Sequence, residues 1–146
     1  MDVIGKLNDI TNGNLLLWKV ILTTIVIALA GLQVALAAGF YEVATLPGIP
    51  PATATRVHRV SGRIAIGLGL VVAFTCLAGP AGPTSPTRVL LHSIFGTLVF
   101  VLLAAKFALL KLTRSGGRAI PYVGIALFLT FGAIWATSVA DYVAAR

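Results

Sequence analysis

The sequence predicts an all-α integral membrane protein, a four-helix bundle of up-down-up-down topology. Hydrophobic residues make up 58% of the chain and charged residues only 10%, whereas soluble domains carry about 25% charged residues. The mean hydropathy is +1.00, and long apolar runs separated by short polar stretches account for it. Backbone groups inside a bilayer must be paired within their own segment, so each run is expected to be a helix.

Four apolar runs approach the ~20 residues that cross ~30 Å of hydrocarbon. We expect the helices at about 15–38, 57–78, 88–111 and 119–143. They form one transmembrane domain over 15–146, after a polar N-terminal segment at 1–14 that lacks the basic start of a signal peptide. Proline, glycine and basic turns separate the runs. Such short connections predict that consecutive helices are antiparallel neighbours.

The net charge of +7 comes from basic residues at the ends of the apolar runs. That placement indicates topology rather than a nucleic-acid partner. The first and third connections are the more basic ones, so the positive-inside rule places them in the cytoplasm and both termini outside a bacterial cytoplasmic membrane. The arginines of this face could instead bind a phospholipid headgroup or an acidic partner. They are Arg56, Arg59, Arg63, Arg114 and Arg118.

Two histidines are the main candidates for cofactor chemistry, because imidazoles from facing helices can hold a b-type haem in a bundle. His58 and His92 each lie a few residues inside the start of their own predicted helix. Since those helices run antiparallel, the two rings are separated by roughly 20 Å along the membrane normal. A single haem bound between His58 and His92 is therefore not expected.

The end of the second predicted helix should lie opposite His92, at the same depth. Its residues there are Phe74, Thr75 and Cys76. A threonine is a poor iron ligand, and an apolar setting disfavours the thiolate form of a cysteine. His92 is thus either one haem ligand or a hydrogen-bonded packing residue, and His58 is a candidate for a second site. No catalytic or metal-binding constellation is predicted.

Several segments of the chain resemble a family of small four-helix bacterial membrane proteins of unknown function. That family is common in actinobacteria and is similar to cytochrome b561-type bundles. The most specific matches are 58–63 (HRVSGR) and 87–93 (TRVLLHS), and the others lie at 18–20, 32–33, 104–106, 120–124 and 135–138. The resemblance implies a Tyr-His-Cys-like end to the second helix. Cys76 matches its cysteine and His92 the facing histidine, but Thr75 stands where the second histidine would be.

Two functions are compatible with these features. The first is an accessory subunit of a larger respiratory or redox membrane complex, without a cofactor or catalytic activity of its own. The second is a b-type cytochrome that exchanges electrons with a quinone or a partner protein, with a second haem ligand from Lys19 or another subunit. The expected partners are the lipid bilayer and other membrane subunits, with a quinone or phospholipid as a candidate ligand. A transporter is less favoured, because no acidic residue is expected in mid-membrane.

Overall fold

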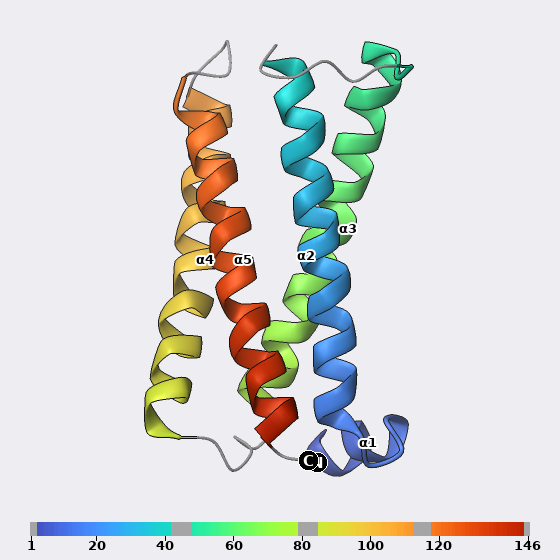
Figure 1. Cartoon of the computed structure of the whole chain (residues 1–146), viewed down its shortest axis with the longest axis vertical. Helices are drawn as coiled ribbons and strands as arrows, with labels where there is room; N and C mark the ends of the chain where they lie inside the picture. The colour runs from blue at the N-terminus through green and yellow to red at the C-terminus, as the bar shows by residue number, and fades with distance from the viewer. Residues whose placement is uncertain (1–2, 42–47, 79–84, 113–117, 145–146) are drawn as a thin grey trace.

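The computed structural model describes residues 3–41, 48–78, 85–112 and 118–144. Within these ranges the chain forms four long apolar helices in an up-down-up-down bundle, preceded by one short helix (Figure 1). This confirms the predicted fold class, and the chain is a multi-pass membrane protein. The helices are α1 (Val3–Ile10), α2 (Leu15–Phe40), α3 (Pro51–Ala78), α4 (Pro86–Leu112) and α5 (Ala119–Ala144).

The helix α3 begins at Pro51, six residues before the start predicted from the apolar run. Proline is tolerated at the first position of a helix, because its missing N–H would have no helical partner there. The hydroxyl of Thr55 donates to the carbonyl of Pro51 at 2.9 Å, within the added turn. This turn is mostly polar or small and exposed, so hydropathy could not reveal it. The helix α4 likewise begins at a proline, Pro86.

The predicted polar N-terminal segment contains the short helix α1, which a tight reversal joins to α2. Asn12 and Gly13 have φ of 49° and 76°, in the left-handed region that asparagine and glycine adopt most readily. The Gly13 N–H donates to the Asn8 carbonyl at 2.8 Å. The reversal places α1 beside the start of α2, at the same end of the bundle as the end of α5 (Figure 1).

The close helix pairs are α2–α3, α4–α5 and α2–α5. The prediction that all consecutive helices are packed neighbours is therefore wrong for α3 and α4, which follow each other but do not pack closely. Small residues explain the close pairs, since they let membrane helices approach. A Cβ atom on Gly31 of α2 would lie only 3.5 Å from the Phe128 ring of α5.

Side-chain hydrogen bonds add to the contacts of the central helix α2. The amide nitrogen of Gln33 donates to the His58 carbonyl at 2.8 Å and to the Ser61 hydroxyl at 2.6 Å, which ties α2 to α3. On the other side, the Trp135 indole N–H donates to the Thr24 hydroxyl at 2.9 Å, which ties α5 to α2. The helix α2 is thus held on two sides, and α3 and α4 are the outer members of the set.

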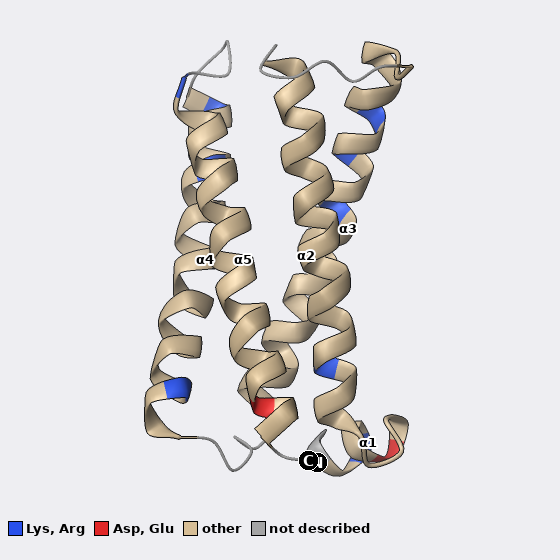
Figure 2. Ribbon diagram, in the orientation of Figure 1, with Lys and Arg blue, Asp and Glu red and all other residues tan. Residues whose placement is uncertain are grey.

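Charged residues lie towards the two ends of the bundle (Figure 2). Asp9 and Asp141 lie at the end that carries α1 and the end of α5, whereas the three arginines of α3 lie towards the opposite end. By the positive-inside rule, this charge distribution predicts that the α1 end lies outside.

We expect a C-terminal alkaline phosphatase fusion to be active in a bacterial host, because that enzyme folds only in the oxidising periplasm. A C-terminal green fluorescent protein fusion should correspondingly be dark. A fluorescent fusion combined with an inactive phosphatase fusion would invert the predicted topology.

Candidate functional site

A cavity of about 1110 Å³ lies between the membrane-spanning helices and is also lined by α1. Ligand pockets in proteins usually measure about 300–1,000 Å³, so this one can hold a large small molecule. Its walls along α4 extend from Val89 to Leu103, which is roughly 21 Å at 1.5 Å per residue. The cavity therefore covers about two-thirds of the ~30 Å hydrocarbon thickness.

The lining is strongly asymmetric along the membrane normal. The ionisable groups that line it, together with Cys76, gather at the α1 end; these are Lys19, Cys76, His92 and Asp141. Deeper in the membrane the walls are mostly apolar and are formed by Ile66, Leu70, Val99, Phe100 and Phe131 among others. The cavity thus has a polar end near one membrane interface and a long apolar body.

The helices α3 and α4 both line the cavity, yet they do not pack closely against each other. Apolar lining residues of both helices remain exposed: Leu70 of α3 by 52% and Val101 of α4 by 57%.

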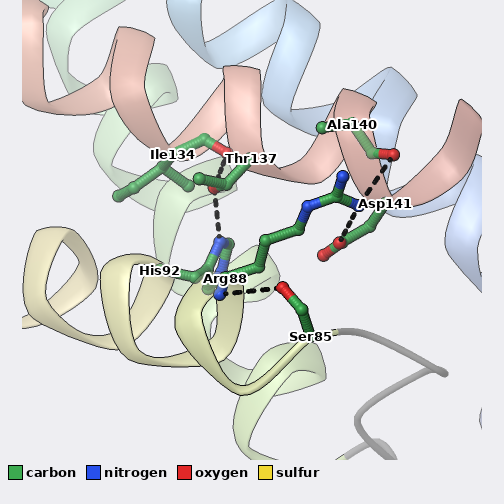
Figure 3. A network of polar contacts seen from close by, with 7 residues as sticks. All are labelled: Ser85, Arg88, His92, Ile134, Thr137, Ala140 and Asp141. Carbon is green, nitrogen blue, oxygen red and sulfur yellow. Dashed lines mark hydrogen bonds and ion pairs between the residues drawn. The ribbon is translucent and has the colours of Figure 1, made fainter. Parts of the chain in front are cut away.

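His92 is the best-positioned side chain at the polar end. Its Nδ1 lies 2.9 Å from the Thr137 hydroxyl of α5, which itself donates to the Ile134 carbonyl at 2.8 Å (Figure 3). With the hydroxyl proton donated to Ile134, we assign the ring proton to Nδ1, which donates it to Thr137. This assignment leaves the lone pair on Nε2. A hydrogen bond at one ring nitrogen orients a histidine whose other nitrogen binds a ligand or accepts a proton.

The Nε2 atom of His92 lies next to Cys76. The Cys76 Sγ is 3.8 Å away, across the gap between α3 and α4. A thiol is only a weak hydrogen-bond donor, so a hydroxyl group could replace it at Nε2. The positive charge of Lys19 acts on both His92 and Cys76, which places this ammonium at the same end of the cavity.

An ion pair lies beside this polar end. The Arg88 guanidinium of α4 is 3.5 Å from the Asp141 carboxylate of α5, and it also donates to the Ala140 carbonyl at 3.4 Å (Figure 3). The two charges offset each other, and their side chains are 40% and 20% exposed, so the pair adds little stability. Lys19 has no ion-pair partner among the described residues.

His58 lies at the other end of the bundle, as the sequence predicts. Its ring contacts the Phe40 ring edge-to-face, with 5.4 Å between the centroids, near the end of α2. His92 instead lies at the end where α2 begins, close to Lys19. The His58 Nδ1 is buried and has no hydrogen-bond partner in the described part of the chain. The two histidines therefore belong to separate places, and one bound group cannot reach both.

The residues around His92 do not fit a bis-histidine haem. Thr75, at the position where the resemblance places the second histidine, is buried and donates to the Val72 carbonyl of its own helix at 2.8 Å. The neighbouring group that faces His92 is the Cys76 thiol. His92 could therefore supply one axial ligand, but the described residues around it hold no second histidine to supply the other.

The predicted arginine site is only partly described. Arg56, Arg59 and Arg63 are exposed on α3, and Arg118 is exposed just before α5, whereas Arg114 lies outside the described residues. Sequence reasoning missed Thr137, which orients His92 from another helix. In the sequence, Thr137 stood out only as part of segment 135–138, one of the stretches that resemble the family. That resemblance does not indicate a hydrogen bond to α4.

The family comparison covers nearly all of the structure described above. The chain matches DUF6529, a family of unknown function, over residues 7–145, which include all four membrane-spanning helices. No curated protein and no solved structure gives a significant match. The length of the family match establishes that this four-helix membrane protein belongs to the DUF6529 family.

Proposed function

We propose that this chain is a small membrane accessory subunit that holds one lipid-soluble ligand in its interhelical cavity. The observation that carries the proposal is the asymmetry of the cavity, with a polar end near one interface and an apolar body below it. A ligand that matches this shape has a small polar head and a long apolar tail. Membership of a respiratory or redox complex is the context that we propose for such a subunit.

The lack of close packing between α3 and α4 supports the same function. Binding sites for molecules from water open towards an aqueous face, but exposed apolar residues such as Leu70 and Val101 border this cavity at membrane depth. A ligand dissolved in the bilayer could enter without crossing the membrane interface. Lateral entry would also explain why α3 and α4 stay apart although closer contact would add packing interactions.

Filling the cavity should abolish ligand retention. Gly96 of α4 lines the cavity, and a Cβ built on it meets nothing within 4 Å. A Gly96→Leu side chain would therefore enter the cavity without displacing the backbone, and we expect at least a tenfold loss of co-purified ligand. Gly67 of α3 is the matched control, because it is exposed, has equal free space and does not line the cavity.

The measurement is native mass spectrometry of protein purified in mild detergent, with extraction and identification of the bound molecule. Gly67→Leu should retain the ligand at the level of the unchanged chain. Equal retention by Gly96→Leu, or no ligand in the unchanged protein, would contradict a ligand-holding function.

A second candidate is a haem protein, favoured by one observation, the His92 ring that Thr137 orients at the cavity wall. His92 would supply one axial ligand, and another subunit would have to supply the other. A reduced-minus-oxidised visible spectrum of the purified complex separates the two functions. A sharp α-band that is lost in His92→Ala would establish the haem protein, and a flat spectrum from folded protein would exclude it.

A further inference from the structure

We propose that the ligand of this cavity is a quinol, a hydroquinone ring on a long isoprenoid tail, bound with a ring hydroxyl donating to Nε2 of His92. This inference rests on the proposed ligand-holding function and specifies the head that the polar end recognises. It follows from which hydrogen-bonding groups at that end remain uncommitted.

The first uncommitted group is an acceptor. With the proton assigned to Nδ1 beside Thr137, Nε2 of His92 presents a lone pair at the cavity wall. Among the described residues, the donor near this lone pair is the weak Cys76 thiol, at 3.8 Å. A ligand head must therefore bring an O–H or N–H group to satisfy Nε2.

The second uncommitted group is a donor. The Lys19 ammonium lines the same end of the cavity and has no ion-pair partner among the described residues. The nearby Asp141 carboxylate forms an ion pair with Arg88 at 3.5 Å instead, although its buried Oδ1 has no hydrogen-bond partner among the described residues. A ligand head must then also carry an oxygen that accepts from an ammonium.

Together these groups select the chemistry of the head. A phosphate or carboxylate anion without a separate O–H or N–H group would accept from Lys19 but has no proton to donate, and its negative charge would face the Nε2 lone pair. An oxidised quinone has carbonyl oxygens alone and leaves Nε2 unsatisfied in the same way. A hydroquinone satisfies both sides, since each phenolic oxygen can donate and accept. From His92 to Leu103 the cavity extends roughly 17 Å along α4, and the part of this length beyond the ring accepts the first part of the tail.

The geometry also specifies a preference between redox forms. The reduced form makes one hydrogen bond more than the oxidised form, and a net hydrogen bond contributes about 0.5–1.5 kcal/mol. Since 1.4 kcal/mol corresponds to tenfold in affinity, the quinol should bind about 2–10-fold more tightly than the quinone. No redox step within this chain is implied.

The test uses the full chain in phosphatidylcholine nanodiscs, with decylubiquinol and decylubiquinone as probes in equilibrium binding. The unchanged protein should prefer the quinol by the stated factor. His92→Leu should weaken quinol binding to the level of the quinone and leave quinone binding nearly unchanged. His92→Gln keeps an acceptor oxygen and should restore part of the preference, which a merely structural role of His92 would not predict.

The failures of the two proposals are distinguishable. Equal binding of both redox forms, or a quinol preference that survives His92→Leu, would overturn the inference about the head. A native ligand that is a phospholipid or fatty acid and is lost in Gly96→Leu would also overturn the inference about the head. The ligand-holding function of the cavity would then stand. If the cavity holds nothing and binds neither probe, the function itself is wrong.

Discussion

Gly62→Leu should separate α2 from α3 and destabilise the bundle by about 3 kcal/mol, the upper part of the usual range for overpacking. A Cβ at Gly62 would lie 3.0 Å from the amide oxygen of Gln33 and 3.4 Å from its amide carbon. Gln33 cannot easily move aside, because its nitrogen donates to both the His58 carbonyl and the Ser61 hydroxyl. The rest of the leucine side chain would collide with this anchored amide.

The effect is measured by unfolding the protein in mixed micelles with increasing sodium dodecyl sulfate, followed by tryptophan fluorescence. Gly67→Leu on the same helix is the control, because its Cβ meets nothing within 4 Å, and it should not destabilise the protein. Removing the obstacle with Gln33→Ala should make the cost of Gly62→Leu smaller than additive. Strict additivity of the two substitutions would show that the Gln33 amide is not the cause.

Leu36→Ala should destabilise the protein by about 2 kcal/mol, near the lower limit measured for buried leucines in soluble proteins. Leu36 is only 3% exposed and is one of the best-buried large side chains in the described residues. Lipid tails are as apolar as leucine, so burial itself contributes little in a membrane. What remains is the loss of packing contacts around the cavity that the alanine leaves.

Leu32→Ala on the same helix tests this reasoning with the same chemical change. Leu32 is 39% exposed, so its contacts with lipid are replaced by other contacts with lipid, and we expect a change within about 0.5 kcal/mol. The same detergent titration measures both variants. Equal losses for Leu36→Ala and Leu32→Ala would show that the interior of this bundle is not tightly packed.

The fold class followed from hydropathy because a bilayer leaves few alternatives. An apolar run as long as Leu15–Phe40 can satisfy its backbone only as a helix, and short connections then alternate the helix directions. Hydropathy detects the part of a helix that lies in hydrocarbon, so it missed the polar first turns of α3 that begin at Pro51. It also gave no signal for α1, a short helix among polar residues.

The candidate site was predicted only in part. The sequence named His92 and His58 as candidates, predicted that one group would not bind both, and predicted that Cys76 lies opposite His92, because depth along a helix is set by residue number alone. The contact of Cys76 Sγ with His92 Nε2 agrees with that depth. Rotation about the helix axis is not set by residue number in the same direct way, so the partner on α5, Thr137, could not be foreseen.

The sequence by itself determined that this protein lies in a lipid bilayer. It also determined the number and direction of the spanning helices and the depths of the ionisable residues. These properties depend on composition and on a constant rise per residue. The tertiary structure alone decided that α2 packs against both α3 and α5 while α3 and α4 stand apart around a large cavity. Lateral helix arrangement depends on which small side chains meet across helices, such as Gly31 with Phe128 and Gly62 with Gln33. Hydropathy is the same for every arrangement that keeps the same residues in the membrane, and therefore cannot choose among them.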